Sequence, residues 1–324
     1  MKTTVPVLAP KLLRGKKAAL IAPAFSFDAT VMEQGRAYFE TRYGVRTLVL
    51  PNVHEHEGYL AGSDQRRLDE VFHWLTEPGV SALIAIRGGY GCARIYPELI
   101  KKLKAYKKLK PKIVAGYSDL TIILNGLYQD LGWITFHAPV IVGRPFRTPT
   151  PIEEQTFRQS LFSSEPLGSI GDEGMSVLSD GKARGRIIGG CLSLVVSSLG
   201  TSYEIDTEDK ILFLEDVDER PYRLDRMLTQ LLHAGKLDKL KGLVFGQMVH
   251  CEPTPESRDP MKTTALEAIK LAIGPYLKKK GIPAVLNFPA GHGMPQITFP
   301  IGAKVELQAN PKNPRVVFLE PGVR

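Results

Sequence analysis

Five continuous apolar segments alternate with amphipathic stretches in the first 140 residues, and this alternation constrains the fold more than any other feature. The apolar segments are expected to be strands, at 18–24, 45–50, 80–86, 112–117 and 133–140. The stretches between them have helical spacing, at 29–43, 63–75, 92–109 and 119–130. Apolar strands separated by helices are typical of a mainly parallel sheet that is covered on both faces. We therefore expect an α/β protein.

The texture of the chain changes after the fifth expected strand. Residues 143–182 are rich in Pro, Ser, Gly and Thr, with one helix expected near 153–161, which indicates a crossover between domains. Beyond this segment, short apolar strands alternate with helices expected near 222–234 and 262–280. We expect an N-terminal domain at 1–145, a crossover at 146–184, and a smaller mixed α/β domain at 185–324 that ends in antiparallel strands.

The net charge of +8 comes from one segment of the chain. Residues 101–112 (KKLKAYKKLKPK) hold seven Lys and no acidic residue. Without them the chain has 35 basic and 34 acidic residues, so its net charge would be close to zero. Ile95, Leu99, Leu103 and Tyr106 recur at helical spacing, which places the lysines of 101–110 on the outer face and C-terminal half of the expected helix. We therefore expect a solvated lysine face and no nucleic-acid partner.

The sequence also bears on location and metal binding. No run approaches the ~18 apolar residues of a membrane helix, and two Pro and an RGKK segment interrupt the apolar N-terminus. Cys92, Cys191 and Cys251 are odd in number and far apart, as expected of reduced thiols in a cytoplasmic protein with no membrane association. His54 and His56 lack metal-site spacing, so we expect no metal.

Ser118 lies in the sequence AGYSD, where an expected strand meets an expected helix. A sharp strand-to-helix turn next to a small residue presents a serine hydroxyl at the carboxyl edge of a sheet, as in a nucleophile elbow. The amide of Asp119 is then placed to donate to an oxyanion. The GxSxG pattern is incomplete, because Leu120 replaces the second glycine. A helix N-cap serine is the alternative interpretation.

A glycine-rich turn, RGGYG at 87–91, follows the third expected strand. Gly88, Gly89 and the amide of Tyr90 would let the backbone approach an anion closely. The dinucleotide pattern GxGxxG fails because Arg94 stands where the third glycine belongs, and no GxxxxGK[ST] occurs. One side of an oxyanion hole, a phosphate cradle and a plain tight turn therefore remain open interpretations.

Two further polar residues follow apolar strands of the second half. Glu215 ends the strand ILFLE ahead of an acidic cluster, and His292 lies between two glycines in NFPAGHG. Ser118, Glu215 and His292 occur in an order that a catalytic triad can take, and active sites of open α/β sheets gather at the carboxyl ends of strands. The acidic cluster is equally consistent with loop charges or helix caps.

Several motifs together resemble those of the LD-carboxypeptidases, also called muramoyltetrapeptide carboxypeptidases, to which the microcin C immunity peptidases are related. These motifs are IAPA, AGSDQRR (61–67), RGGYG (87–91), GYSDLT (116–121), GGCLSL (189–194), LEDVDERPYRLDRML (214–228) and GHG (291–293). The resemblance implies a flavodoxin-like N-terminal domain, a smaller C-terminal domain, a homodimer, and a serine peptidase without a cofactor. Cys191 is a departure, because many relatives have Asn there.

The resemblance also assigns roles to residues. It implies Ser118 as nucleophile, Glu215 as acid and His292 as base, with an oxyanion hole from the amide of Asp119 and one of 88–90. The implied reaction cleaves an L,D-peptide bond and releases D-Ala from a murein tetrapeptide in cell-wall recycling. Two other functions stay open: cleavage of a toxic peptidyl- or aminoacyl-nucleotide, and binding of an anionic ligand without catalysis.

Overall fold

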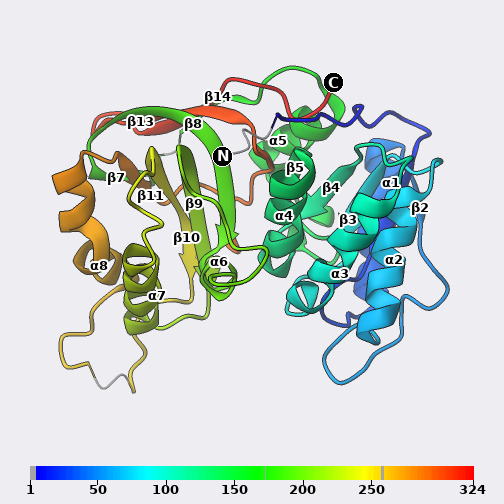
Figure 1. Ribbon diagram of the computed structural model, residues 1–324, viewed down its shortest axis with the longest axis horizontal. Coiled ribbons are helices and arrows are strands. Elements are labelled where there is room, and N and C mark those ends of the chain that lie inside the picture. The colour runs from blue at the N-terminus through cyan, green and yellow to red at the C-terminus, as the bar shows by residue number, and fades with distance from the viewer. Residues whose placement is uncertain (1–4, 172, 257–258) are drawn as a thin grey trace.

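The computed structural model describes residues 5–171, 173–256 and 259–324, and within them the chain forms two sheets that lie side by side (Figure 1). The first sheet has the strand order β12-β5-β4-β3-β1-β2. Its five parallel strands are β1 (Lys17–Ile21), β2 (Arg46–Leu48), β3 (Ala82–Ala85), β4 (Ile113–Gly116) and β5 (Thr135–His137). The order 2-1-3-4-5 is that of flavodoxin-like folds, so the predicted mainly parallel sheet is confirmed.

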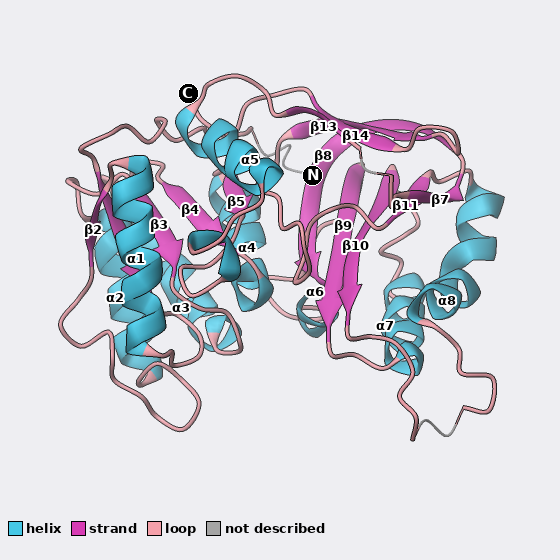
Figure 2. Cartoon of the chain, turned by 180° about the vertical axis from the view of Figure 1, so that it is seen from behind, coloured by secondary structure: helices cyan, strands magenta, loops and turns pink. Residues whose placement is uncertain are grey.

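Helices cover both faces of the first sheet, which explains why its strands are continuously apolar. The helices are α1 (Ala29–Tyr43), α2 (Asp64–Thr76), α3 (Cys92–Ala105) and α4 (Thr121–Leu131). Leu20 packs in one cluster with Met32 and Phe39 of α1, whereas its strand neighbours Ala19 and Ile21 pack with α2 and α3. Figure 2 shows α1 in front of the sheet, together with α5 (Pro151–Phe162).

Two predicted helix boundaries are wrong. The helix expected at 92–109 ends at Ala105, because Tyr106 adopts an extended backbone and the chain then loops into β4. Lys107, Lys108 and Lys110 therefore lie on a loop and not on a helix face. The helix expected at 119–130 begins as a 3-10 turn, η1 (Ser118–Leu120), before α4.

The second sheet has eight strands in the order β6-β14-β13-β8-β9-β10-β11-β7 within the described ranges. Its members are β6 (Gly168–Ile170), β7 (Ser176–Ser179), β8 (Gly181–Cys191), β9 (Lys210–Val217), β10 (Gly242–Val249), β11 (Ala284–Leu286), β13 (Lys304–Ala309) and β14 (Arg315–Phe318). Strands β8 to β11 are parallel, and the flanking strands are antiparallel, so the sheet is mixed as predicted. Leu212 and Leu214 share a cluster with residues of α6 (Leu192–Ser197), α7 (Pro221–His233) and α8 (Ala265–Lys280).

The expected crossover is more structured than its composition indicates. Besides a 3-10 turn, η2 (Arg144–Phe146), and α5, it contains β6 and β7, which form both edges of the second sheet. In the opposite direction, β12 (Phe299–Ile301) leaves the C-terminal part and pairs antiparallel with β5. This pairing buries apolar surface: Phe299 is fully buried and stacks on His137 of β5, with ring centroids 5.0 Å apart.

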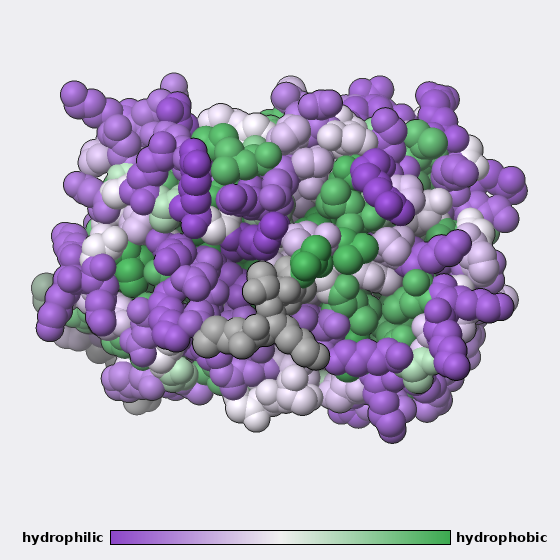
Figure 3. All heavy atoms as spheres, turned by 45° about the horizontal axis from the view of Figure 1, so that its top comes forward, coloured by the Kyte–Doolittle hydropathy of each residue, from purple (hydrophilic) through white to green (hydrophobic). Residues whose placement is uncertain are grey.

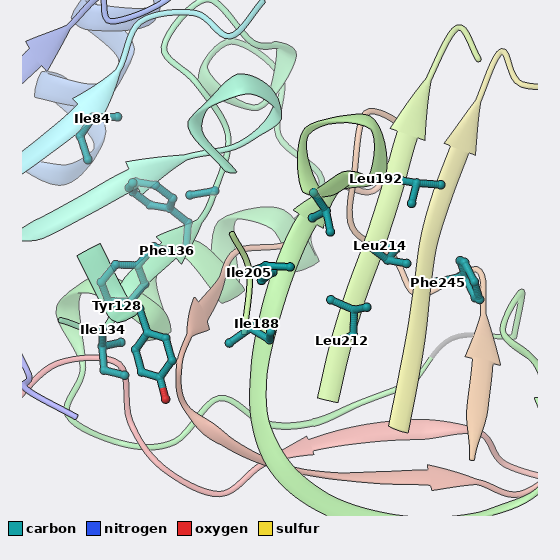
Figure 4. Close-up of a cluster of buried hydrophobic side chains, with 14 of the residues drawn as sticks. Ile84, Tyr128, Ile134, Phe136, Ile188, Leu192, Ile205, Leu212, Leu214 and Phe245 are labelled. Carbon is teal, nitrogen blue, oxygen red and sulfur yellow. The ribbon is translucent and has the colours of Figure 1, made fainter. Parts of the chain in front are cut away.

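A single apolar cluster joins the two halves of the molecule. Figure 4 shows Ile84 and Phe136 of the first sheet in the same cluster as Ile188, Leu212 and Phe245 of the second. All five are at most 1% exposed. Burial of this size stabilises by about 25 cal/mol per Å² of apolar surface, so separating the halves is strongly opposed.

The outer surface is polar on the face turned forward in Figure 3, where hydrophobic residues form smaller separate patches. Within the part of the chain that the structure describes, no helix is both long enough and apolar enough to cross a membrane.

Polar contacts at the junction fix α4 against β8. The side-chain amide of Asn125 accepts from Gly189 N and donates to Gly189 O, both at 2.8 Å. One turn earlier, Thr121 Oγ1 accepts from Cys191 N at 3.0 Å. A side chain at Gly190 would overlap Thr121, so the approach of the helix requires glycine there. The contact uses the backbone N–H of Cys191 and does not involve its side chain.

Asn125→Ala is expected to lower the free energy of unfolding by about 2–4 kcal/mol, because it leaves the buried N–H and C=O of Gly189 without partners. Gln129→Ala is the matched control. Gln129 lies on the same helix as Asn125, and its side-chain amide bonds Glu204 O and Asp206 N, but Gln129 is only partly buried. We expect a loss below about 1 kcal/mol there. Chemical denaturation measures both, and equal losses would contradict a special role for the Asn125 contact.

Candidate active site

Ser118 occupies the turn between β4 and α4, with a left-handed backbone (φ 60°). Such a backbone costs a non-glycine residue about 1–2 kcal/mol, as in a nucleophile elbow. A Cβ at Gly116 would lie 2.8 Å from Leu120 Cγ, so the sharp turn needs glycine there. The Ser118 hydroxyl makes no hydrogen bond with any residue in the described ranges, so the alternative of an N-cap serine does not hold.

The glycine-rich turn after β3 lies directly beside Ser118. A Cβ on Gly88 would be 2.8 Å from Ser118 Cβ and 3.0 Å from its Oγ, so only glycine leaves this space open. The amides of Gly88, Gly89 and Tyr90 make no hydrogen bond among the residues that the structure describes. The amide of Asp119 lies in the first turn of a helical segment, where amides lack intrahelical partners. Donors for an anion are therefore present on both sides of Ser118.

A buried network connects the two turns. The carboxylate of Asp119 is fully buried and accepts from Cys92 N at 2.8 Å, capping α3. Arg67, also fully buried, donates to Pro23 O at 2.6 Å and to Gly91 O at 2.9 Å, and it pairs with Asp64. Burial raises the pKa of Asp119, while Cys92 and Arg67 oppose this shift. Arg67 is not among the site residues predicted from the sequence, although its AGSDQRR motif is part of the family resemblance.

Glu215 and His292 form a hydrogen-bonded pair on the second sheet. Glu215 Oε2 lies 2.7 Å from His292 Nδ1, and the carboxylate is fully buried while the imidazole is 14% exposed. A Cβ on Gly291 would be 2.9 Å from Glu215 Oε2, so this glycine makes the approach possible. With Nδ1 held by the carboxylate, Nε2 is the nitrogen left for proton transfer.

Gln247 of β10 fixes the histidine loop. Its Oε1 accepts from Gly293 N at 3.0 Å, and its Nε2 donates to Pro295 O at 3.2 Å. These bonds hold the loop on both sides of its turn, so His292 is preorganised. Gln247 is not predicted from the sequence, because the residues that it bonds are more than 40 positions away in the chain.

The imidazole of His292 lies beside the serine turn. The rings of Tyr117 and His292 have centroids 4.7 Å apart, and Tyr117 directly precedes Ser118. A second series of contacts links the serine turn to Glu215. Thr121 Oγ1 accepts from Cys191 N, and Cys191 is the register partner of Glu215 in β9. The structure thus brings the surroundings of all three predicted residues to the boundary between the sheets. Tyr90, in contrast, is 40% exposed at the rim, near Tyr59.

The electrostatics of the pair favour a protonated imidazole. Burial is the largest single influence and lowers the pKa of His292, but the hydrogen bond and charge of Glu215, with Asp216 and Asp218, raise it above 6.5 overall. His137, fully buried nearby, has its pKa lowered to about 3 by burial and by the charge of His292. Burial acts in the opposite direction on an acidic group: it raises the pKa of the Cys191 thiol, which makes this thiol a poor nucleophile.

No group of three or more potential metal ligands (His, Cys, Asp or Glu) clusters anywhere in the described residues. Serine hydrolases on α/β folds use two such features for catalysis: a serine on a strained strand-to-helix turn and a buried carboxylate–histidine pair.

Comparison with known proteins identifies the family. The LD-carboxypeptidase N-terminal domain matches residues 18–138, and the LD-carboxypeptidase C-terminal domain matches residues 184–307. A probable murein peptide carboxypeptidase of Bacillus subtilis is 33% identical over 322 residues, 97% of this chain and 95% of that protein. A murein tetrapeptide carboxypeptidase of Pseudomonas aeruginosa is 30% identical, over 91% of this chain and 94% of that one.

Solved structures agree with this result. The muramoyltetrapeptide carboxypeptidase of Oxalobacter formigenes superimposes with a TM-score of 0.78 at 26% identity, over 94% of this chain and all of that one. The microcin C7 self immunity protein MccF shares the fold, with a TM-score of 0.83 at 21% identity over 98% of this chain and all of that one. The chain belongs to the LD-carboxypeptidase family, which is a family of serine hydrolases.

The histidine pair predicts a distinctive titration. By NMR, His292 is expected to titrate above pH 6.5, and Glu215→Gln is expected to lower that pKa, because the imidazolium then loses its carboxylate partner. His137 is the internal control, since it should stay neutral throughout the range from pH 5 to 8. An unchanged His292 pKa in the variant would contradict the pairing.

Proposed function

We propose that this protein is a serine carboxypeptidase that cleaves an L,D-peptide bond and releases a terminal D-amino acid, D-Ala, from murein tetrapeptides during cell-wall recycling. The observation that carries the proposal is the 2.7 Å contact of the buried Glu215 with His292, beside the strained turn of Ser118. The murein peptide substrate is supported by two relatives, at 33% and 30% identity, that are named as murein peptide carboxypeptidases.

In the proposed mechanism, Ser118 Oγ attacks the scissile carbonyl carbon while His292 Nε2 takes its proton. Glu215 accepts from Nδ1–H and stabilises the imidazolium. The oxyanion is held by the amide of Asp119 and one amide of 88–90, each worth about 3–4 kcal/mol in other serine peptidases. His292 then protonates the leaving nitrogen, and the D-amino acid departs. A water molecule, deprotonated by His292, cleaves the acyl-enzyme and restores Ser118.

We also propose that the protein works in the cytoplasm as a homodimer without a metal or organic cofactor. The three cysteines are buried and free, which suits a reducing compartment. The homodimer rests on family resemblance, and light scattering during size exclusion measures it directly.

Ser118→Ala is expected to lower kcat/KM for D-Ala release from murein tetrapeptide by about 10⁴-fold or more, because the nucleophile is lost. Ser193→Ala is the matched control: this hydroxyl contacts Cys191 and Asp216 at the junction and has no part in the mechanism. Coupled detection of free D-Ala measures both variants.

Three outcomes separate this proposal from its rivals. Equal D-Ala release by wild type and Ser118→Ala would refute the nucleophile assignment. Cleavage of aspartyl sulfamoyl adenosine but not of tetrapeptide would favour a nucleotide-linked substrate, and that compound is bound in a structure of MccF. Turnover of neither substrate would indicate a binding protein. A tetrapeptide ending in L-Ala tests the stereochemistry.

The pH dependence follows from the raised pKa of His292. The base must be neutral, so kcat/KM is expected to fall as the pH drops through a value above 6.5. Glu215→Gln should move this limb to lower pH and reduce kcat by about 10²–10⁴-fold, because the imidazolium loses its stabilising carboxylate. An acidic limb that is identical in both proteins would assign the titration to another group.

A further inference from the structure

The lysine segment at 101–112 divides into two sets with different surroundings. Three lysines on α3 each pair with a carboxylate: Lys101 with Glu98 at 3.3 Å, Lys102 with Asp69 at 3.2 Å, and Lys104 with Asp130 at 2.5 Å. Lys107, Lys108 and Lys110 follow on the loop before β4 and are exposed. Within residues 5–171, 173–256 and 259–324, these three side chains make no ion pair or hydrogen bond. The unbalanced positive charge of the segment is therefore concentrated on the loop.

The three unpaired lysines line a cavity of about 800 Å³. Leu75, Val80, Tyr106 and Leu109 supply apolar wall, and no Asp or Glu side chain is among the residues that line it. Sites for small molecules commonly span roughly 300–1,000 Å³ and combine apolar wall with a few polar groups. The cavity has that size and that composition, and the charged side chains among its lining residues are all basic.

Lys112 anchors the loop at the base of this cavity. It is only 6% exposed, and its Nζ donates to Trp74 O at 2.7 Å and to Glu77 O at the C-terminal end of α2. Cations at that end of a helix are stabilised by its dipole. Because Lys112 is followed directly by β4, one end of the lysine loop is tied to the sheet.

We propose that this cavity binds a small organic phosphate of nucleotide size, with its phosphate groups against Lys107, Lys108 and Lys110 and its apolar or aromatic body against Tyr106 and Leu109. Lysines bind phosphate as point charges, and a terminal phosphate carries about −1.5 to −2 at neutral pH. Several lysines along one cavity that has no Asp or Glu side chain in its lining favour such a polyvalent anion over a single carboxylate.

The cavity lies at the opposite edge of the sheet from the candidate active site. Val80 and Ser81 precede β3 and Lys112 precedes β4, whereas Ser118 follows β4. Ser118 lies six residue steps after Lys112 along extended chain, a span of about 20 Å. The proposed ligand is therefore not the substrate of the serine, and the inference does not depend on the proposed function.

Isothermal titration calorimetry with ADP and with inorganic pyrophosphate at low ionic strength tests the proposal on the full chain. The test variant carries Lys107→Ser, Lys108→Ser and Lys110→Ser, and the control variant carries Lys101→Ser, Lys102→Ser and Lys104→Ser. Both lose the same formal charge from the same segment. We expect the test variant to bind ADP at least about tenfold more weakly and the control to stay within about threefold of wild type.

Three results would overturn the proposal: no saturable binding of either probe by wild type at millimolar concentration, equal loss in both variants, or binding of phosphatidylglycerol vesicles or RNA in place of ADP. The last result would indicate a macromolecular docking surface. D-Ala release and thermal stability are measured alongside, and both are expected to match wild type in the test variant.

Discussion

The docking of α4 against β8 is the contact on which the rest of the site depends. Helix α4 begins just after Ser118, and through Asn125 and Thr121 it bonds the backbone of Gly189 and Cys191. These bonds are buried, and Ile188 and Leu192, which flank the bonded backbone, belong to the apolar cluster that includes residues of both sheets. Breaking a buried hydrogen bond without replacement costs about 1–3 kcal/mol, so the helix cannot shift cheaply. The position of the serine turn relative to the second sheet is set here.

This docking also explains how residues so far apart in the sequence come to lie at one boundary between the sheets. Cys191 is the register partner of Glu215, and Glu215 holds His292, so a short chain of contacts runs from the serine helix to the imidazole. Each close approach along it needs glycine, at position 190 for the helix and at position 291 for the carboxylate. The result is a rigid site assembled from two sheets, as electrostatic preorganisation requires.

The sequence predicts the parts of this assembly better than the way they join. Strand ends and a small residue beside Ser118 reveal the candidate residues, because apolar strands and tight turns are local signals. Asn125 and Gln247 are not revealed, since each sits in an apolar helix or strand and its partners are distant in the chain. The same limit applies to β12, whose pairing with β5 joins residues more than 150 apart. The sequence also predicts a helix where the chain forms a loop after Ala105, because the helical spacing of apolar residues continues past the end of α3.

The proposed mechanism requires Ser118, Glu215 and His292 to act on one scissile bond between the two sheets. A crystal structure of Ser118→Ala with an uncleaved murein tetrapeptide bound tests it most directly. We expect the scissile carbonyl carbon above Cβ of residue 118, with its oxygen within hydrogen-bond distance of the Asp119 amide and of one amide of 88–90. His292 Nε2 should face the same carbon. A peptide bound elsewhere, or with its scissile bond beyond reach of His292, would contradict it.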